Sequence, residues 1–176
     1  IEACGISTVV LQSGEDLLPE DRVCDLVRKI KVETDLFVTL SIGERRYDDY
    51  LAFRKAGADR YLLKHETASK TLFEILRPGS SFENRRKCLL WLKDLGYETG
   101  AGNLIGLPGQ SVTDLAEDLL YLRELKADMV GIGPFIAHPD TPLAGMPGGT
   151  GEMTLKAVSL TRLLLPQANI PATTAL

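Results

Sequence analysis

Five short apolar segments of this chain each end in a cluster of polar residues, and a helix-like stretch follows each time. The segments begin at Thr8, Phe37, Arg60, Glu98 and Met129. Parallel α/β enzymes carry their chemistry at the carboxyl ends of strands. A strand that only packs has no need for polar residues at the same end each time. The pattern therefore predicts a parallel α/β enzyme.

Boundary residues support the same division into strands and helices. Gly5, Gly57 and Gly96 each stand between a helix-like segment and the next strand, where a left-handed residue ends a helix. Ser111 and Asp114 have the spacing of a capping box. The strands show little alternation of polar and apolar residues, which is typical of strands buried on both faces.

The last helix-like segment carries an apolar stripe of Leu155, Val158 and Leu163 and ends at Pro166. We expect that stripe to face the core, as the stripes of the other helices do.

About six βα units fill the 176 residues. Eight such units would close a (β/α)₈ barrel of ~250 residues. We therefore expect one α/β domain over residues 1–176, a partial (β/α)₈ TIM barrel truncated at both ends. Residues 1–5 read as the last turn of a helix, and residues 172–176 read as a strand cut before its loop. A doubly wound sheet is the competing fold. Such a sheet concentrates its binding site at one topological switch point, whereas here polar clusters end every strand.

Composition excludes several classes of partner. The net charge is −4, with 44% hydrophobic and 25% charged residues. The chain therefore lacks the excess of positive charge that is typical of proteins that bind nucleic acid or a membrane surface. No apolar run approaches the ~20 residues that span a bilayer, and no signal peptide is visible. We expect a cytoplasmic protein that binds neither nucleic acid nor membrane.

The three cysteines, Cys4, Cys24 and Cys88, fit no zinc or iron–sulfur spacing. Each has apolar helical neighbours, which predicts small buried side chains in a reducing compartment. We therefore assign no metal ligand in this chain.

Two strand ends carry candidate binding residues. In Gln12-Ser-Gly-Glu-Asp16, Gly14 allows close backbone approach, and exposed carbonyls with Glu15 suit an ammonium group. The alternative is a helix-entry loop with solvated acids. Thr39 and Ser41 lie two residues apart and share one strand face, where short hydroxyls orient a small ligand or bond to the local backbone.

Lys64-His65-Glu66 is the densest ionisable triplet. At a barrel mouth, the Glu66 carboxylate could accept hydrogen bonds from the two hydroxyls of a ribose. Lys64 on a barrel strand could instead form a Schiff base with a carbonyl substrate. An ion pair between the two at the rim is the alternative. His65 is more typical of a structural hydrogen bonder than of a catalyst, so we assign no catalytic residue.

Arg85 shares the inward stripe of Leu89 and Leu92 on its helix. A buried guanidinium is costly unless it meets an anion. A ligand carboxylate is one candidate anion, and a protein acid such as Glu66 is the other.

The segment from Gly100 to Gln110 holds four glycines and a proline, which favours close approach of a flat ligand such as adenine. Its spacing does not match the dinucleotide fingerprint. His138 is expected at the rim without a ligand. The glycine-rich loop of residues 145–151 carries no phosphate signature.

Taken together, several of these segments resemble the HydE-type maturases of FeFe-hydrogenases, which are radical S-adenosylmethionine (SAM) enzymes related to biotin synthase. The resemblance covers essentially all 176 residues. It rests on the order and spacing of residues 11–16, 39–44, 61–67, 76–78, 81–85, 100–110, 131–136, 138–142 and 169–174.

The resemblance implies a (β/α)₈ barrel with a [4Fe–4S] cluster that binds SAM and cleaves it reductively to a 5′-deoxyadenosyl radical. It implies a small sulfur- and iron-containing organometallic substrate and other hydrogenase maturation proteins as possible partners. By this resemblance, Glu66 would bind the SAM ribose and Arg85 the SAM carboxylate. The methionyl amine would be bound by Gln12, Ser13, Gly14 and Glu15. Leu104 and Ile105 would flank the adenine region, and Thr39 and Ser41 would face the substrate.

The sequence departs from the family pattern because it has no C-x₃-C-x₂-C loop. In the family that loop would lie upstream of Ile1, so we expect this chain to be inactive by itself. Lys64 stands where many relatives would carry arginine. The alternatives are another biotin synthase-like enzyme such as a methylornithine synthase relative, a Schiff-base aldolase that uses Lys64, and a cluster-less SAM-binding scaffold.

Overall fold

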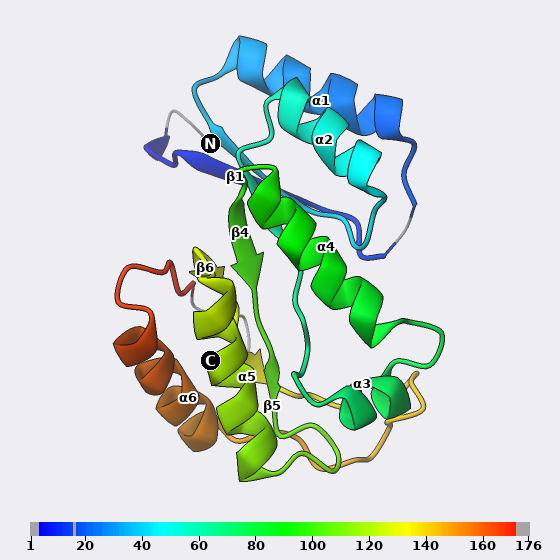
Figure 1. The fold of residues 1–176 in the computed structure, drawn as a ribbon, viewed down its shortest axis with the longest axis vertical. Helices are drawn as coiled ribbons and strands as arrows, with labels where there is room; N and C mark the ends of the chain where they lie inside the picture. The colour runs from blue at the N-terminus through cyan, green and yellow to red at the C-terminus, as the bar shows by residue number, and fades with distance from the viewer. Residues whose placement is uncertain (1–3, 16, 172–176) are drawn as a thin grey trace. The chain divides into compact units, whose positions relative to one another are not determined.

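The computed structural model describes residues 4–15 and 17–171 (Figure 1). The chain forms two compact units, Ile1–Leu63 with Glu83–Gly100 and Lys64–Phe82 with Ala101–Leu176. Most of the helix turn expected at residues 1–5, and all of the strand expected at residues 172–176, lie outside the described residues. The expectation of a single barrel core over residues 1–176 stays a prediction.

Unit 1 is built on four parallel strands in sequence order. They are β1 (Thr8–Gln12), β2 (Phe37–Ser41), β3 (Arg60–Leu62) and β4 (Glu98–Ala101), whose last residue belongs to unit 2. The register pairs Gln12 with Ser41 and Leu62 with Gly100. The carboxyl ends of the strands therefore meet along one edge, which is where the polar clusters follow.

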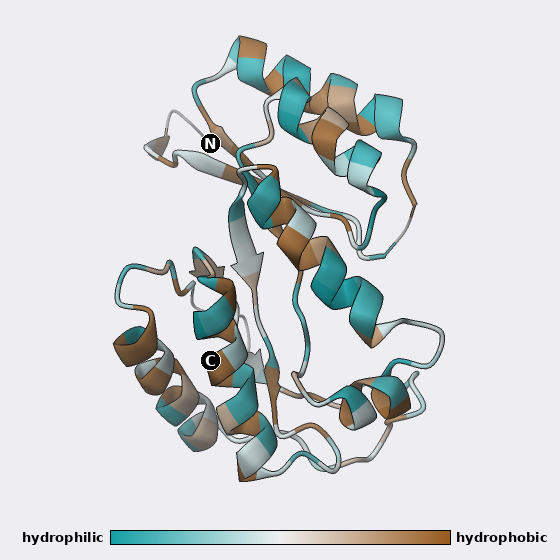
Figure 2. Cartoon of the chain, viewed as in Figure 1, coloured by the Kyte–Doolittle hydropathy of each residue, from teal (hydrophilic) through white to brown (hydrophobic). Residues whose placement is uncertain are grey.

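Three helices belong to unit 1: α1 (Glu20–Glu33), α2 (Tyr47–Ala56) and α4 (Phe82–Asp94), of which Phe82 is in unit 2. Helices α1 and α2 pack side by side (Figure 1). Hydrophobic and hydrophilic residues alternate along the helices, as Figure 2 shows. The predicted stripe of α4 is buried at Leu89 and Leu92, and Gly57 ends α2 in the left-handed conformation, as predicted.

Three buried tyrosines form the centre of unit 1. The rings of Tyr50 and Tyr61 meet edge to face at 5.0 Å, and those of Tyr61 and Tyr97 at 5.9 Å. The Tyr61 hydroxyl donates to the Gly43 carbonyl oxygen at 2.8 Å, and the Tyr97 hydroxyl donates to the Tyr50 carbonyl oxygen at 2.6 Å. Burial raises the pKa of all three phenols. They therefore stay neutral and act as fixed hydrogen-bonding groups.

Unit 2 contains α3 (Lys70–Leu76), β5 (Leu104–Ile105), α5 (Val112–Leu125), β6 (Met129–Val130), β7 (Gly133–Pro134) and α6 (Gly151–Leu164). Strands β5 and β7 pair in parallel, and α5 packs beside α6 (Figure 1). The capping box of Ser111 and Asp114 opens α5, as the sequence predicted. Its hydrogen bonds lower the pKa of the Asp114 carboxyl.

The apolar stripe predicted for the last helix is wrong. Leu155 and Leu163 of α6 are exposed, and the helix buries Thr154, Ala157 and Thr161 instead. Both threonine hydroxyls donate at 2.8 Å to carbonyl oxygens of the preceding turn. Small residues whose polar atoms are satisfied within their own helix can be buried at little cost.

The prediction for the cysteines holds at two positions of three. Cys24 and Cys88 are buried, and Cys4 is exposed. Burial raises the pKa of the Cys24 thiol to about 12, with a hydrogen bond to Glu20 acting in the same direction. Apolar neighbours in the sequence therefore predicted burial correctly for the two cysteines in helices, Cys24 and Cys88, and wrongly for Cys4.

The predicted fold class is confirmed, because the described strands pair in parallel and helices connect them. Within the described residues no helix has both the length and the hydropathy to span a bilayer.

The Tyr61 hydroxyl should be a measurable part of the stability of unit 1. We expect Tyr61→Phe to lower the free energy of unfolding by about 1–2 kcal/mol, because the buried Gly43 carbonyl loses its donor. Urea denaturation followed by circular dichroism measures the change. Tyr47→Phe, at a tyrosine that is 39% exposed, is the control and should change it by less than about 0.5 kcal/mol. Equal effects would show that the Tyr61 bond contributes nothing specific.

Candidate functional site

Unit 1 gathers its charges where β1 and β2 end. Glu15 follows β1, Glu44 follows β2, and Arg85 lies in the first turn of α4. The Arg85 side chain is 3% exposed. Its Nη2 lies 2.8 Å from Oε1 of Glu15, and its Nε lies 2.6 Å from Oε1 of Glu44. One buried cation therefore joins the ends of two neighbouring strands.

The sequence left open whether Arg85 meets a ligand carboxylate or a protein acid. In this structure its partners are protein acids, Glu15 and Glu44. Glu15 was expected to have another role, and no motif singled out Glu44 or Asn84, whose amide donates to Glu44. A usable signal was present, because Gly-Glu follows two successive strands, as Gly14-Glu15 and Gly43-Glu44.

The loop after β2 is shaped to bring these acids together. Gly43 has a φ of 77°, and a Cβ there would meet Oε2 of Glu15 at 2.6 Å, so a side chain at Gly43 would displace Glu15. The Tyr61 hydroxyl holds the Gly43 carbonyl oxygen, and the Arg45 backbone N–H donates to the Tyr50 hydroxyl at 3.0 Å. The tyrosine core of unit 1 thus fixes the loop that carries Glu44.

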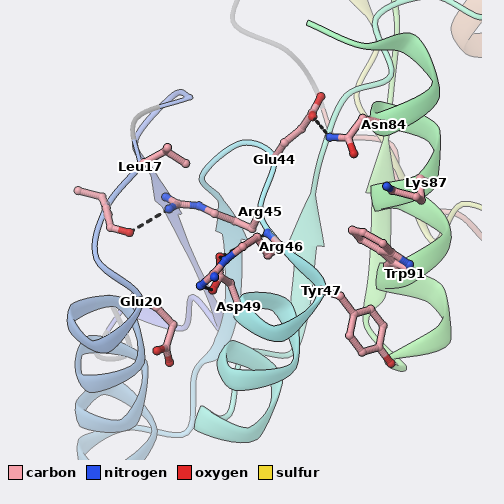
Figure 3. A pocket seen from close by; sticks show the side chains of 11 residues that line it. Leu17, Glu20, Glu44, Arg45, Arg46, Tyr47, Asp49, Asn84, Lys87 and Trp91 are labelled. Carbon is pink, nitrogen blue, oxygen red and sulfur yellow. Dashed lines mark hydrogen bonds and ion pairs between the residues drawn. The ribbon is translucent and has the colours of Figure 1, made fainter.

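A pocket of about 560 Å³ opens beside this cluster. Figure 3 shows Glu44 and Asn84 facing each other at its edge, with Tyr47, Lys87 and Trp91 on its far wall. The Arg45 and Arg46 side chains near its centre are paired, with the Leu18 carbonyl oxygen and with Asp49 respectively (Figure 3). The sequence analysis assigned no function to these lining residues.

The remaining candidates of unit 1 lie at the same edge of the sheet. Gln12 and Gly14 are exposed and Ser13 is partly buried, with its N–H donating to the Ser41 carbonyl oxygen at 3.4 Å. Thr39 is buried and Ser41 partly buried, and both belong to β2. These residues adjoin the charge cluster along the chain, and their binding roles stay predictions.

Unit 2 has a smaller pocket, of about 170 Å³, and Glu66 is one of the residues that line it. Its other lining residues are mostly apolar and come from β5 and from the segments after β3, β5 and β7: Thr67, Phe73, Leu76, Arg77, Leu104, Leu107, Phe135 and Leu143. An apolar hollow with one carboxylate at its edge suits a ligand that combines a flat ring with hydroxyl groups.

Glu66 adopts a left-handed backbone conformation, with a φ of 68°. Such a conformation costs a non-glycine residue about 1–3 kcal/mol. Here its N–H donates to the Gly102 carbonyl oxygen at 3.0 Å, and its carbonyl oxygen accepts from the Leu104 N–H at 3.2 Å. The Arg77 guanidinium lies 3.4 Å from the Glu66 carboxylate. Strain held by surrounding bonds is typical of a functional position.

Leu104 and Ile105 of β5 have different surroundings. Leu104 lines the pocket, whereas Ile105 is buried and does not line it. The glycines of this segment were expected to admit a flat ligand. At Gly106 the closest approach is instead by protein backbone, because a Cβ there would meet the Gly149 Cα at 2.3 Å. That glycine is therefore explained by packing against the loop of residues 145–151.

The ionisable residues around Glu66 are placed as follows. Burial lowers the pKa of Lys64, and the nearby Glu66 carboxylate acts in the opposite direction. His65 is 2% exposed and lies edge to face with Tyr121, which agrees with a structural position. His138 is exposed, and its Nδ1 accepts from the Asp140 N–H at 3.2 Å. Among the residues described, no group of histidine, cysteine and acidic side chains is arranged to hold a metal ion.

Residues 1–122 match the family model of the radical SAM superfamily, which is more than half of the chain. The chain belongs to the radical SAM superfamily. The barrel-type architecture predicted from the sequence is confirmed by solved structures of this superfamily. One is a methylornithine synthase, with a TM-score of 0.88 and 31% identity over 96% of this chain and 50% of the other.

Among curated proteins, the chain is similar to the [FeFe] hydrogenase maturase subunit HydE of Thermotoga maritima. The identity is 59% over 98% of this chain and 49% of the relative. It is also 30% identical to a 3-methylornithine synthase of Methanosarcina acetivorans, over 98% of this chain and 50% of the relative. The resemblance to HydE-type maturases is thus confirmed, and the chain spans about half the length of these curated relatives.

A further likeness bears on the fold alone. The hydrogenase maturase HydG gives a TM-score of 0.79 at 17% identity over 94% of this chain and 41% of the other. A deoxyribose-phosphate aldolase from Coccidioides immitis gives 0.52 at 17% identity over 94% of this chain and 59% of the other. The aldolase hypothesis for Lys64 gains nothing beyond this shared fold.

The buried Arg85 should be costly to remove. We expect Arg85→Met to lower the free energy of unfolding by about 2–3 kcal/mol, because Glu15 and Glu44 then face each other without their cation. Adding Glu44→Gln should restore part of the loss, because one of the two unpaired carboxylates is gone. Urea denaturation of both variants tests this.

Lys87→Met replaces an exposed cation of the same helix that lies 4.7 Å from the Trp91 ring centroid. This control should cost no more than about 1 kcal/mol. A second loss on adding Glu44→Gln, in place of a recovery, would contradict the charge-cluster account.

Proposed function

We propose that this chain is the SAM-binding barrel core of a longer HydE-type maturase, which acts in assembly of the active-site cluster of FeFe-hydrogenases. The observation that carries the proposal is the 59% identity to HydE over 98% of this chain. The two polar sites at strand ends support it, because each offers groups that complement one half of SAM.

The pocket of unit 2 suits the adenosyl half. The Glu66 carboxylate at its rim would accept from the two ribose hydroxyls, and the apolar side chains of Leu104, Leu107 and Phe135 would contact adenine. Arg77 now pairs with Glu66 and would have to share that carboxylate with the ribose. A nucleoside therefore fits the chemistry of the residues present.

The charge cluster of unit 1 suits the methionyl half, which carries both a carboxylate and an ammonium group. The Arg85 guanidinium would bind the SAM carboxylate in place of Glu15. Glu15, thus released, would accept from the ammonium group beside the exposed carbonyls of Gln12, Ser13 and Gly14. The exchange keeps the charge balance of the buried site, since one carboxylate replaces another.

The described residues do not fit the [4Fe–4S] cluster that the superfamily implies. Their three cysteines are not grouped, and no other set of ligands is close enough for a metal ion. The cluster ligands would come from the C-x₃-C-x₂-C loop that we expect elsewhere in the longer protein. Such a cluster, held elsewhere in the longer protein, would supply the electron for the radical chemistry of SAM.

Substrate and partners follow from the HydE proposal. Thr39 and Ser41 would face a small sulfur-containing organometallic substrate, and other hydrogenase maturation proteins would be partners in a cytoplasmic pathway. A methylornithine synthase activity is the second candidate, because that relative has the TM-score of 0.88. Assay of the purified full-length protein for methylornithine formation separates the two.

The ribose assignment is tested by SAM affinity. In the full-length protein we expect Glu66→Ala to weaken SAM binding by about 1–3 kcal/mol, which is the range for a lost charge-assisted hydrogen bond. Isothermal titration calorimetry measures the change. Glu74→Ala removes an exposed carboxylate of α3 and should leave the affinity unchanged. Unchanged affinity in Glu66→Ala would remove the role assigned to Glu66.

The substrate assignment is tested separately. Ser41→Ala should spare reductive cleavage of SAM and lower turnover of the maturation substrate, because its hydroxyl is assigned to the substrate alone. Chromatographic measurement of 5′-deoxyadenosine without substrate is the readout. Loss of that uncoupled cleavage would instead place Ser41 in SAM binding or in the fold.

A further inference from the structure

Unit 2 contains a buried carboxylate that the proposed function does not use. Asp118 lies in α5 and is 0% exposed. Its Oδ2 accepts from Nδ2 of Asn103 at 3.1 Å and from Nε2 of Gln110 at 3.3 Å. Its Oδ1 accepts from the Ala68 backbone N–H, and Nε2 of His65 lies 3.8 Å away. A buried charge of this kind is stable because several donors surround it.

Each donor belongs to a segment that forms a wall of the Glu66 pocket. Ala68 is two residues after Glu66, and Asn103 pairs with Glu66 as an isolated parallel bridge. Gln110 holds the neighbouring segment, because its Oε1 accepts from the N–H groups of Gly106 and Leu107, at 2.7 and 3.2 Å. Its Nε2 also donates to the Leu104 carbonyl oxygen at 3.0 Å. Asp118 therefore bonds both to the segment that carries Glu66 and to the adjacent segment that carries Leu104 and Leu107.

The backbone at Glu66 gives this link a specific consequence. Its left-handed conformation is one that a glutamate rarely adopts unless its neighbours are fixed on both sides. Asn103 adjoins the residues that bond the Glu66 backbone, and Ala68 fixes the chain just beyond it. Loss of the Asp118 carboxylate would therefore release Glu66 from the conformation that presents its side chain to the pocket.

We propose that Asp118 is a positioning residue for nucleoside binding, which holds Glu66 and the Leu104–Leu107 segment in register from behind the pocket. The inference rests on the proposed function of that pocket in binding the adenosyl part of SAM. Asp118 does not line the pocket, so it acts through its hydrogen-bonding partners. A carboxylate is suited to the position because all three partners are donors, whereas an asparagine would turn its own NH₂ group toward at least one of them.

The first test follows local order and needs no ligand. In the full-length protein, hydrogen–deuterium exchange should be at least about tenfold faster at residues 65–70 and 103–110 in Asp118→Asn than in the unchanged protein. Leu122→Ala, which removes a fully buried side chain from the same helix, is the matched control. It should destabilise unit 2 without a selective effect on those two segments. Unchanged exchange there in Asp118→Asn would overturn the inference.

The second test measures SAM affinity by calorimetry. Asp118→Asn should raise the dissociation constant about tenfold or more, and Leu122→Ala should leave it within about twofold while SAM is bound to folded protein. In a Glu66→Gln background, Asp118→Asn should raise it by less than about threefold, because the larger part of its effect acts through Glu66 and only the part through the Leu104–Leu107 segment remains. Full additivity of the two substitutions, or an equal effect of Leu122→Ala, would overturn the inference.

The two proposals fail in different ways. If the unchanged full-length protein bound no SAM, the proposed function would fall, and the exchange measurement would still decide whether Asp118 orders the pocket.

Discussion

Both polar sites depend on the same constraint, which is that a charge removed from water must be met by opposite charge or by hydrogen-bond donors. In unit 1 the buried charge is Arg85, and the ends of β1 and β2 supply its carboxylates. In unit 2 the buried charge is Asp118, and the segments after β3, β4 and β5 supply its donors. In each case the charge on a helix fixes the loops at the carboxyl ends of neighbouring strands.

The strand exits share a second feature. Gly14, Gly43 and Glu66 all have positive φ values and follow parallel strands. A left-handed residue turns the chain abruptly away from the strand direction, so that the next side chain stays at the edge of the sheet. At Gly14 and Gly43 the positive φ carries no steric cost, because glycine has no Cβ. A glutamate follows each of these glycines. At Glu66 the glutamate itself takes the strained conformation, which ties its position to the hydrogen bonds that hold it.

Much of the fold could be predicted from the sequence because its signals are local. The strands beginning at Thr8, Phe37, Arg60, Glu98 and Met129, the Gly57 helix end and the Ser111 capping box each depend on a few adjacent residues. The stripe of α6 was mispredicted because burial depends on what packs against a helix, and hydrophobicity alone does not specify that. Glu15 follows a strand, Glu66 and Leu104 line a pocket, and Arg85 is buried on its helix, and the binding roles assigned to them stay predictions.

The partners of those residues could not be predicted, because they are set by contacts between distant segments. Arg85 meets Glu15 across 70 positions of sequence, and Ala68 meets Asp118 across 50. In the sequence Asp118 looks like one more acid in a helix that also carries Asp114 and Glu117. Only its bonds to Ala68, Asn103 and Gln110 in the structure show that it is buried among donors. Buried acids are therefore the class of functional candidate that sequence patterns miss most easily here.

The proposed function depends most on Glu66, which would bind the ribose of SAM in the pocket that Leu104, Leu107 and Phe135 line. The most direct measurement is a crystal structure of the full-length protein with SAM. Both ribose hydroxyls should lie within about 3 Å of the Glu66 carboxylate oxygens, which is ordinary hydrogen-bond distance. Adenine should lie against the apolar side chains of the pocket. A well-ordered SAM whose ribose lies away from Glu66, with the Arg77–Glu66 pair still in place, would contradict it.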